Sequence, residues 1–177
     1  TAADFIVEKA NEFPGQVTVV AMASATNVAL ALRQDQNIKH KLHEIIHLSG
    51  AFFVNGNVNP CAEANAFGDP EAADELYGSG AGVTVIGLDV TQKLVTTARD
   101  MARMRARNHP HTNFLHDISQ FYMQFHRDTV RQEGIFMHDP AALLLAFRKD
   151  LFSCKLGRVR VATEGLCRGQ TIMDAGE

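Results

Sequence analysis

Two short stretches of the chain carry side chains whose types and spacing could do chemistry. The first is a loop rich in Asn, Gly and Pro that contains Asn57, Glu63 and Asn65. Carboxylate and amide groups together both accept and donate hydrogen bonds, which suits a ligand with several hydroxyl groups. The alternative is a structural loop whose Asn side chains cap turns. The residues alone leave both interpretations open.

The second stretch is His138-Asp139-Pro140, which also permits two interpretations. Asp directly before Pro is a strong helix start, because Asp is favoured at the N-cap and Pro at the first helical position. A His–Asp pair at the start of a helix could instead supply an acid and a metal-binding carboxylate.

A third pattern, His43-Glu44-Ile45-Ile46-His47, matches the H-E-x-x-H motif of zinc peptidases, and Glu71 could be imagined as a further ligand. That motif needs a helix, because only then can residues i and i+4 share one metal ion. The apolar residues that follow instead predict a strand that runs into a loop. On a strand the two histidines would lie roughly 13 Å apart, at about 3.3 Å per residue. The zinc site is therefore the weaker alternative.

Buried strands that alternate with helices are expected to position these side chains. The apolar, β-branched run over residues 17–23 predicts a strand covered on both faces, as in a parallel sheet. Further strands are expected over residues 44–50, 83–88, 158–162 and 170–173. The predicted fold class is α/β, a mainly parallel sheet with helices on both faces. In such sheets ligands bind outside the carboxyl ends of the strands.

Helices are expected between the strands, and no internal repeat or linker interrupts the pattern. They are predicted over residues 3–12, 27–33, from 69 to a glycine at 78 or 80, 94–107, 112–133 and 139–147. The loops over residues 23–27, 50–68 and 89–93 would then leave carboxyl ends of strands. Residues 1–177 are predicted to form a single domain.

The composition excludes several classes of protein. Of 177 residues, 46% are hydrophobic and 21% are charged, as is usual for a folded domain. The net charge of −3 argues against a nucleic-acid partner, and the cluster Arg99, Arg103, Arg105 and Arg107 is explained as a solvated helix face. The apolar runs are too short for a membrane span. Three cysteines are too few for a disulfide framework. This small number favours reduced thiols and a cytoplasmic location.

Taken in order and spacing, these stretches make the sequence similar to the inosine–uridine nucleoside hydrolases, and most nearly to the plant-type members. The matching segments are AADF from residue 2, TNVALA from 26, GAFFVNGNVNP from 50, AEAN from 62, DPEAAD from 69, VIGLDVT from 85 and HDPA from 138. The resemblance implies a partial nucleoside-hydrolase fold. It also implies cleavage of the N-glycosidic bond of ribonucleosides to ribose and free base, by a water bound to Ca²⁺.

The resemblance further implies a role for each candidate residue. Asn57, Glu63 and Asn65 would bind the ribose hydroxyls. His138 would lie near the leaving base and help to protonate it, and Asp139 and a backbone carbonyl near Met22 would be calcium ligands. Tyr122 and His126, one helical turn apart, would border the base.

The chain departs from the family pattern at its beginning. The family opens with a strand and the motif D-T-D-x-G-x-D-D, whose aspartates supply most calcium ligands and the base that activates water. That motif does not occur in these residues, and the chain starts at Thr1 inside a predicted helix, as a fragment would. Two hypotheses follow: part of an active hydrolase, or a catalytically inactive pseudoenzyme or structural subunit. Under the first hypothesis the N-terminal segment lies on a partner chain or is absent from these residues. The second predicts an obligate partner or a homo-oligomer, because lost strands would leave an exposed sheet edge.

Overall fold

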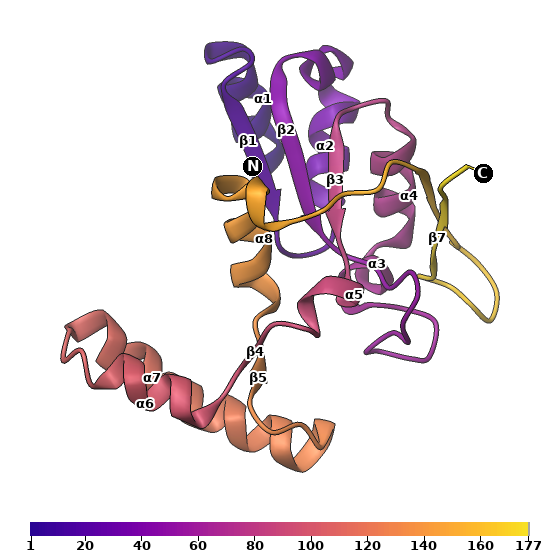
Figure 1. Ribbon diagram of the computed structural model, residues 1–177. Helices are drawn as coiled ribbons and strands as arrows, with labels where there is room; N and C mark the ends of the chain where they lie inside the picture. Colours follow the sequence, from indigo (N-terminus) through magenta and orange to yellow (C-terminus); the bar gives the residue numbers. More distant parts are fainter. Residues whose placement is uncertain (177) are drawn as a thin grey trace. The chain divides into compact units, whose positions relative to one another are not determined.

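A computed structural model describes residues 1–176, which divide into two compact units. Residues 1–90 and 138–176 form the sheet unit, and residues 91–137 form the helical unit (Figure 1). The predicted single domain over residues 1–177 stays a prediction. None of the helices within residues 1–176 combines the length and apolar character that a membrane crossing requires.

The sheet unit is built on a parallel sheet of three strands in the order β1-β2-β3. The strands are β1 (Val17–Ala21), β2 (Leu42–Leu48) and β3 (Val83–Ile86). Ile45 at the centre of β2 pairs with Val19 on one side and Val83 on the other. The parallel sheet predicted from apolar runs is confirmed, and the carboxyl ends of its strands meet at one edge.

Helices cover both faces of this sheet, as predicted, because successive side chains of a strand point to opposite faces. Three helices share a core with Ile45 on one face: α1 (Ala2–Glu12), α2 (Thr26–Gln34) and α4 (Pro70–Gly78). On the other face, Ile46 and Leu48 pack against α8 (His138–Phe147). Both layers are visible in Figure 1.

The start of α4 follows the predicted chemistry. Asp69 is the N-cap, and its carboxylate accepts a hydrogen bond from the Ala72 amide at 3.0 Å. Pro70 occupies the first turn, where its missing N–H costs nothing. The Thr26 hydroxyl also donates to Asp69 at 2.5 Å, which joins the starts of α2 and α4.

The closing strands form where predicted, but they pair with each other outside the parallel sheet. β6 (Arg158–Val161) and β7 (Thr171–Asp174) make an antiparallel hairpin. Asp74 on α4 accepts two hydrogen bonds of 2.7 Å from the Arg160 guanidinium and one of 2.8 Å from the Val161 amide. The Arg160 hydrogen bonds lower the pKa of Asp74, which keeps this anchor charged.

Short helices occupy places where the sequence predicts loops. α3 (Ala64–Gly68) lies in the loop predicted over residues 50–68, and α5 (Leu88–Thr91) lies at the loop predicted over residues 89–93. Two 3₁₀ turns, η1 (Gln36–His40) and η3 (Lys149–Leu151), complete the elements of the sheet unit. Helices this short carry no periodic pattern, so apolar spacing does not reveal them.

The helical unit contains α6 (Ala98–Arg105) and α7 (Pro110–Phe125), which continues into the π-helical turn η2 (His126–Val130). Met101, Met123 and Ile135 form its buried core. The helix predicted over residues 94–107 is wrong at its start, because β4 (Val95–Thr96) pairs there with β5 (Ile135–Phe136).

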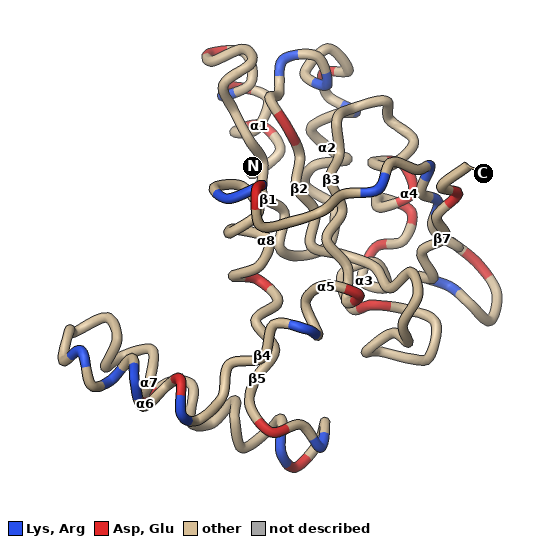
Figure 2. Tube along the Cα trace, viewed as in Figure 1, with Lys and Arg blue, Asp and Glu red and all other residues tan. Residues whose placement is uncertain are grey.

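Arg99, Arg103 and Arg105 of α6 are exposed and form the basic face that the sequence indicates; Figure 2 draws Lys and Arg in blue. Arg103 lies 3.9 Å from Asp100, one turn earlier on the same helix. Arg105 forms an ion pair with Asp117 on α7. Exposed pairs of this kind contribute little to stability, and they partly neutralise the basic face.

Candidate functional site

A cavity of about 160 Å³ opens at the carboxyl edge of the parallel sheet. Its lining includes every candidate residue that belongs to the sheet unit: Met22, Asn57, Glu63, Asn65, His138 and Asp139. Met22 directly follows β1, and Ser49 directly follows β2. The structure therefore brings together six residues from three segments of the sequence, at the edge where parallel sheets bind ligands.

Tight backbone crossings shape the edge of this cavity. Gly50 has a positive φ of 87°, and a Cβ there would lie 2.9 Å from the side chain of Thr171. A Cβ on Gly87 would lie 2.8 Å from the Gly50 carbonyl oxygen. Thr171 also holds the chain just beyond, because its hydroxyl accepts from the Ala51 amide at 3.0 Å and donates to the Ala51 carbonyl at 3.1 Å.

Glu63 is the most constrained of the candidate side chains, with only 5% of its surface exposed. Its carboxylate accepts hydrogen bonds from the amides of Gly50 at 2.9 Å, Asn65 at 3.0 Å and Ala66 at 3.1 Å. Two of these donors, the Asn65 and Ala66 amides, lie in the first turn of α3, where the helix itself offers them no acceptor. Glu63 is the N-cap of this helix and supplies that acceptor. The carboxylate thus fixes the loop to the end of β2.

The two asparagines also hold the backbone with one end of each amide. The Asn65 Nδ2 group donates to the Leu48 carbonyl at 2.8 Å and, more weakly, to the Met22 carbonyl at 3.4 Å. The Asn57 Oδ1 atom accepts from the Ala64 amide at 2.9 Å. The opposite ends, Asn57 Nδ2 and Asn65 Oδ1, are one donor and one acceptor for a ligand.

His138 and Asp139 enter the cavity lining from the start of α8. The predicted helix through Phe147 is confirmed, and it begins at His138, so Asp139 lies in its first turn. His138 is half-buried and Asp139 is exposed. Among the carboxylates of the lining, Glu63 is committed to three amides, which leaves Asp139 as the one facing solvent.

The cavity offers too few oxygen ligands to complete a calcium site. Ca²⁺ takes 6–8 oxygen ligands, whereas the cavity offers the Asp139 carboxylate and the Met22 carbonyl, which already accepts from Asn65. Within residues 1–176, no group of three or more His, Cys, Asp or Glu side chains could hold a metal ion. These residues alone therefore do not fit a bound Ca²⁺.

Tyr122 and His126 belong to the helical unit. Their ring centroids lie 4.3 Å apart, and the His126 Nδ1 atom lies 3.1 Å from the Tyr122 carbonyl oxygen. Tyr122 is 39% exposed, whereas His126 is buried. Their predicted place beside a base stays a prediction.

The H-E-x-x-H pattern lies on strand β2, so the zinc-peptidase interpretation is wrong. His47 is fully buried, with its Nε2 atom 3.0 Å from the Ala23 carbonyl oxygen and its Nδ1 atom 2.9 Å from the Tyr77 hydroxyl. A carbonyl only accepts, so Nε2 carries the proton and Nδ1 accepts from Tyr77. His47 thus braces the turn that follows Met22. The sequence gives no signal for this role.

Acidification is expected to destabilise the protein through His47, because burial lowers the pKa of His47 from 6.5 to about 4. Between these values the unfolded chain binds a proton that the folded chain does not, so stability falls as pH falls. The loss from pH 7 to pH 5 should be about 2 kcal/mol. Urea unfolding at both pH values, for the wild type and His47→Gln, measures it.

The matched control is His43→Gln, which changes an exposed histidine on the same strand. His43→Gln should keep the pH dependence of the wild type, whereas His47→Gln should lose most of it. An equal pH dependence in all three proteins would contradict the assignment to His47.

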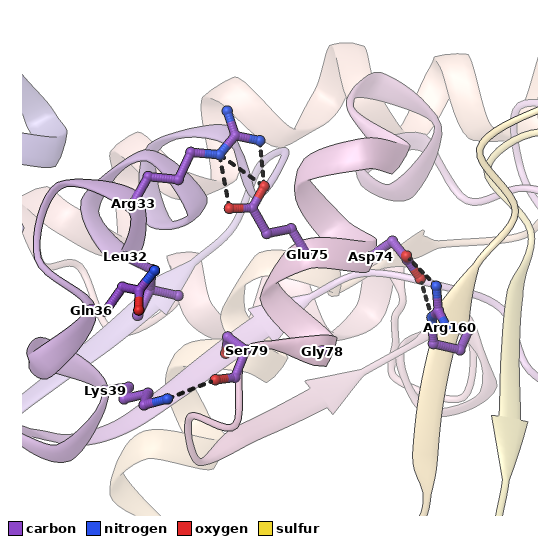
Figure 3. A pocket seen from close by; sticks show the side chains of 9 residues that line it. All are labelled: Leu32, Arg33, Gln36, Lys39, Asp74, Glu75, Gly78, Ser79 and Arg160. Atoms are coloured by element: carbon purple, nitrogen blue, oxygen red, sulfur yellow. Dashed lines mark hydrogen bonds and ion pairs between the residues drawn. The ribbon is translucent and has the colours of Figure 1, made fainter.

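A larger hollow of about 520 Å³ lies elsewhere in the sheet unit, and its charged side chains are already paired (Figure 3). Arg33 binds Glu75 through hydrogen bonds of 2.8 Å, and Arg160 binds Asp74 as described above. Lys39 donates to the Ser79 carbonyl at 3.4 Å. The smaller cavity is the stronger candidate, because its amide ends and exposed carboxylate remain for a ligand.

The fold and the cavity define an α/β protein with its candidate site at the carboxyl edge of a parallel sheet. The model of the inosine-uridine preferring nucleoside hydrolase family matches residues 1–177, and the chain belongs to that family. It is 44% identical over 175 residues to a probable uridine nucleosidase 1 of Oryza sativa subsp. japonica, and 43% identical over 176 residues to uridine nucleosidase 1 of Arabidopsis thaliana. These matches cover 99% of this chain but 54% and 52% of the relatives.

Solved structures give the same result for the fold. A plant nucleoside hydrolase superposes with a TM-score of 0.96 at 39% identity, over 99% of this chain and 55% of that one. A purine-preferring ribonucleoside hydrolase from Gardnerella vaginalis superposes with a TM-score of 0.92 at 35% identity, over 98% and 55%. The nucleoside-hydrolase fold is therefore confirmed, and the chain spans about half the length of its relatives.

Proposed function

We propose that this chain carries the ribose-binding part of a hydrolase that cleaves ribonucleosides to ribose and free base. The supporting observation is the cavity that gathers Asn57, Glu63 and Asn65 beside His138 and Asp139. The names of the rice and Arabidopsis relatives make uridine the first substrate to test.

In this proposal the polar lining binds the sugar. Asn57 Nδ2 donates to one ribose hydroxyl and Asn65 Oδ1 accepts from another. Glu63 holds the backbone at Asn65 through the amides that it binds, and its negative charge favours a sugar that becomes positive as the glycosidic bond breaks. The fixed carboxylate needs no reorientation during the reaction, which is how preorganised groups accelerate chemistry.

At the leaving base, His138 supplies a proton. Asp139 and the Met22 carbonyl are the contribution of this chain to a Ca²⁺ site, whose remaining oxygen ligands must come from outside the described residues. When bound, the ion would hold and activate water. We therefore propose that activity needs a homo-oligomer or a partner chain or segment that supplies these ligands. We also propose a cytoplasmic location, since Cys61, Cys154 and Cys167 are free thiols.

A catalytically inactive pseudoenzyme or structural subunit is the second candidate. The specific observation in its favour is that, within residues 1–176, the cavity offers a calcium ion little more than the Asp139 carboxylate and the Met22 carbonyl. A chain of this kind would keep the fold and the cavity but release no ribose in any context.

Calcium removal from a chimera separates the two candidates. Residues 1–177 replace the matching part of the rice relative, which retains its own remaining segments. Released ribose is measured with uridine and with inosine, before chelation, after chelation and after calcium is restored. The 177-residue chain alone and the intact rice protein are assayed in parallel.

The hydrolase proposal expects calcium-dependent ribose release from the chimera and little or none from the chain alone. A chimera that folds, by circular dichroism and thermal unfolding, but releases no ribose would contradict it and favour the pseudoenzyme. Release that survives chelation would contradict the role proposed for calcium.

A further inference from the structure

Two cysteines that are far apart in the sequence meet in the sheet unit. The Sγ atoms of Cys61 and Cys167 lie 3.6 Å apart, and the Cys61 thiol donates to the Cys167 sulfur. Both thiols are half-buried, whereas Cys154 is exposed. Cys61 lies in the loop that carries Asn57 and Glu63, and Cys167 lies in the turn between β6 and β7.

The backbone already holds these two segments side by side. The Asn59 side chain accepts from the amides of Cys61 and Ala62, each at 2.8 Å. Ala62 then forms an antiparallel β-bridge with Gln170, whose own amide donates to the Cys167 carbonyl at 2.9 Å. A disulfide needs two backbones held close with their side chains facing each other. The two sulfurs, now 3.6 Å apart, must approach to about 2.05 Å for the bond to form.

We propose that Cys61 and Cys167 are a site of reversible oxidation, where a low-molecular-weight disulfide such as oxidised glutathione converts the two thiols into an intramolecular disulfide. One cysteine thiolate attacks a glutathione sulfur, which breaks the glutathione disulfide and releases one reduced glutathione. The second thiolate attacks the resulting mixed disulfide and releases the other. Two protein thiols are oxidised, one glutathione disulfide is reduced, and the two thiol protons pass to the released glutathiones.

The environment of the pair sets the conditions for the reaction. The pKa of the Cys61 thiol is raised by its hydrogen bond to Cys167 and by partial burial. Exchange requires a thiolate, so the oxidation should accelerate as pH rises. A bond between the loop and the hairpin would restrict the unfolded chain strongly, because it closes a loop across residues 106 positions apart.

The test uses the reduced protein, incubated with oxidised glutathione at pH 7.0 and pH 8.5. Peptide mapping without reductant should find a Cys61–Cys167 cross-link, formed faster at the higher pH and reversed by dithiothreitol. The oxidised protein should melt roughly 5–10 °C higher than the reduced protein. These readouts are covalent and thermal, so they do not depend on the proposed hydrolase activity.

Three serine variants complete the design. Cys154→Ser should keep both the cross-link and the thermal shift, whereas Cys61→Ser and Cys167→Ser should each lose both. The proposal is overturned if Cys61 and Cys167 remain thiols, or carry separate glutathiones, when the exposed Cys154 has been modified. A cross-link through Cys154 instead would overturn it too. Because the wild type is compared in both redox states, an unstable variant does not weaken the test.

Discussion

Replacing Asp139 by alanine in the chimera is expected to abolish calcium-dependent ribose release and to weaken calcium binding by at least about a hundredfold. Even residues that only support metal ligands alter affinity by about 10–100-fold, and Asp139 is proposed as a direct ligand. Glu63 cannot replace it, because its oxygens accept from three backbone amides. Ribose release and calorimetric titration with Ca²⁺ measure both effects.

The matched control is Asp150→Ala, which removes an exposed aspartate paired with Arg148 outside the cavity lining. That variant should keep the calcium affinity and turnover of the parent chimera. Asp139→Asn, which keeps the size of the side chain but not its charge, should fall between the parent and Asp139→Ala. Unchanged turnover and calcium affinity in Asp139→Ala would remove Asp139 from the site.

Replacing Glu63 by glutamine is expected to lower the free energy of unfolding by about 2–4 kcal/mol. One acceptor oxygen becomes an NH₂ group that must face a backbone N–H, and the remaining bonds lose the carboxylate charge. Hydrogen bonds to charged groups contribute about 1.5–3 kcal/mol, and a buried donor left unpaired costs about as much. Because the same carboxylate fixes the loop that carries both asparagines, ribose binding should be lost together with stability.

Urea unfolding at pH 7 measures the change in stability, and amide hydrogen exchange at Gly50, Asn65 and Ala66 locates it. Glu71→Gln is the control, since it makes the same substitution in an exposed ion pair with Arg168, where the expected cost is below about 1 kcal/mol. If Glu63→Gln unfolds like Glu71→Gln and its three amides stay protected, the anchoring role of Glu63 is wrong.

The sheet could be predicted from the sequence because its signals are local. An apolar, β-branched run marks β1, and Asp69 before Pro70 marks the start of α4. The elements that escaped prediction depend on distant partners. The N-cap of α3 also binds Gly50, at the end of β2, and the two-residue strand β4 exists only because β5 pairs with it. Neither partner is visible in a local window of sequence.

The cavity lining contains the candidate residues predicted in the sheet unit, but the sequence does not show what each of them binds. Parallel strands bring their carboxyl ends together, so residues after β1 and β2 were expected to meet. The sequence does not show that Glu63 and Asn65 each bind the backbone, because every residue carries a backbone amide or carbonyl and no residue type marks the ones that they bind. The same holds for His47 with Tyr77, and for Cys61 with Cys167, whose contacts form only in the folded chain.

The hydrogen bonds between Thr171 and Ala51 have a consequence for how the protein is made. They join residues 120 positions apart, so this attachment of the chain beside the cavity cannot form until the β6–β7 hairpin has left the ribosome. The parallel strands and α4 emerge long before that point and can fold first. The cavity should therefore be among the last parts of the sheet unit to form during synthesis. A chain that stalls before Thr171 would display the sheet with its candidate site unfinished.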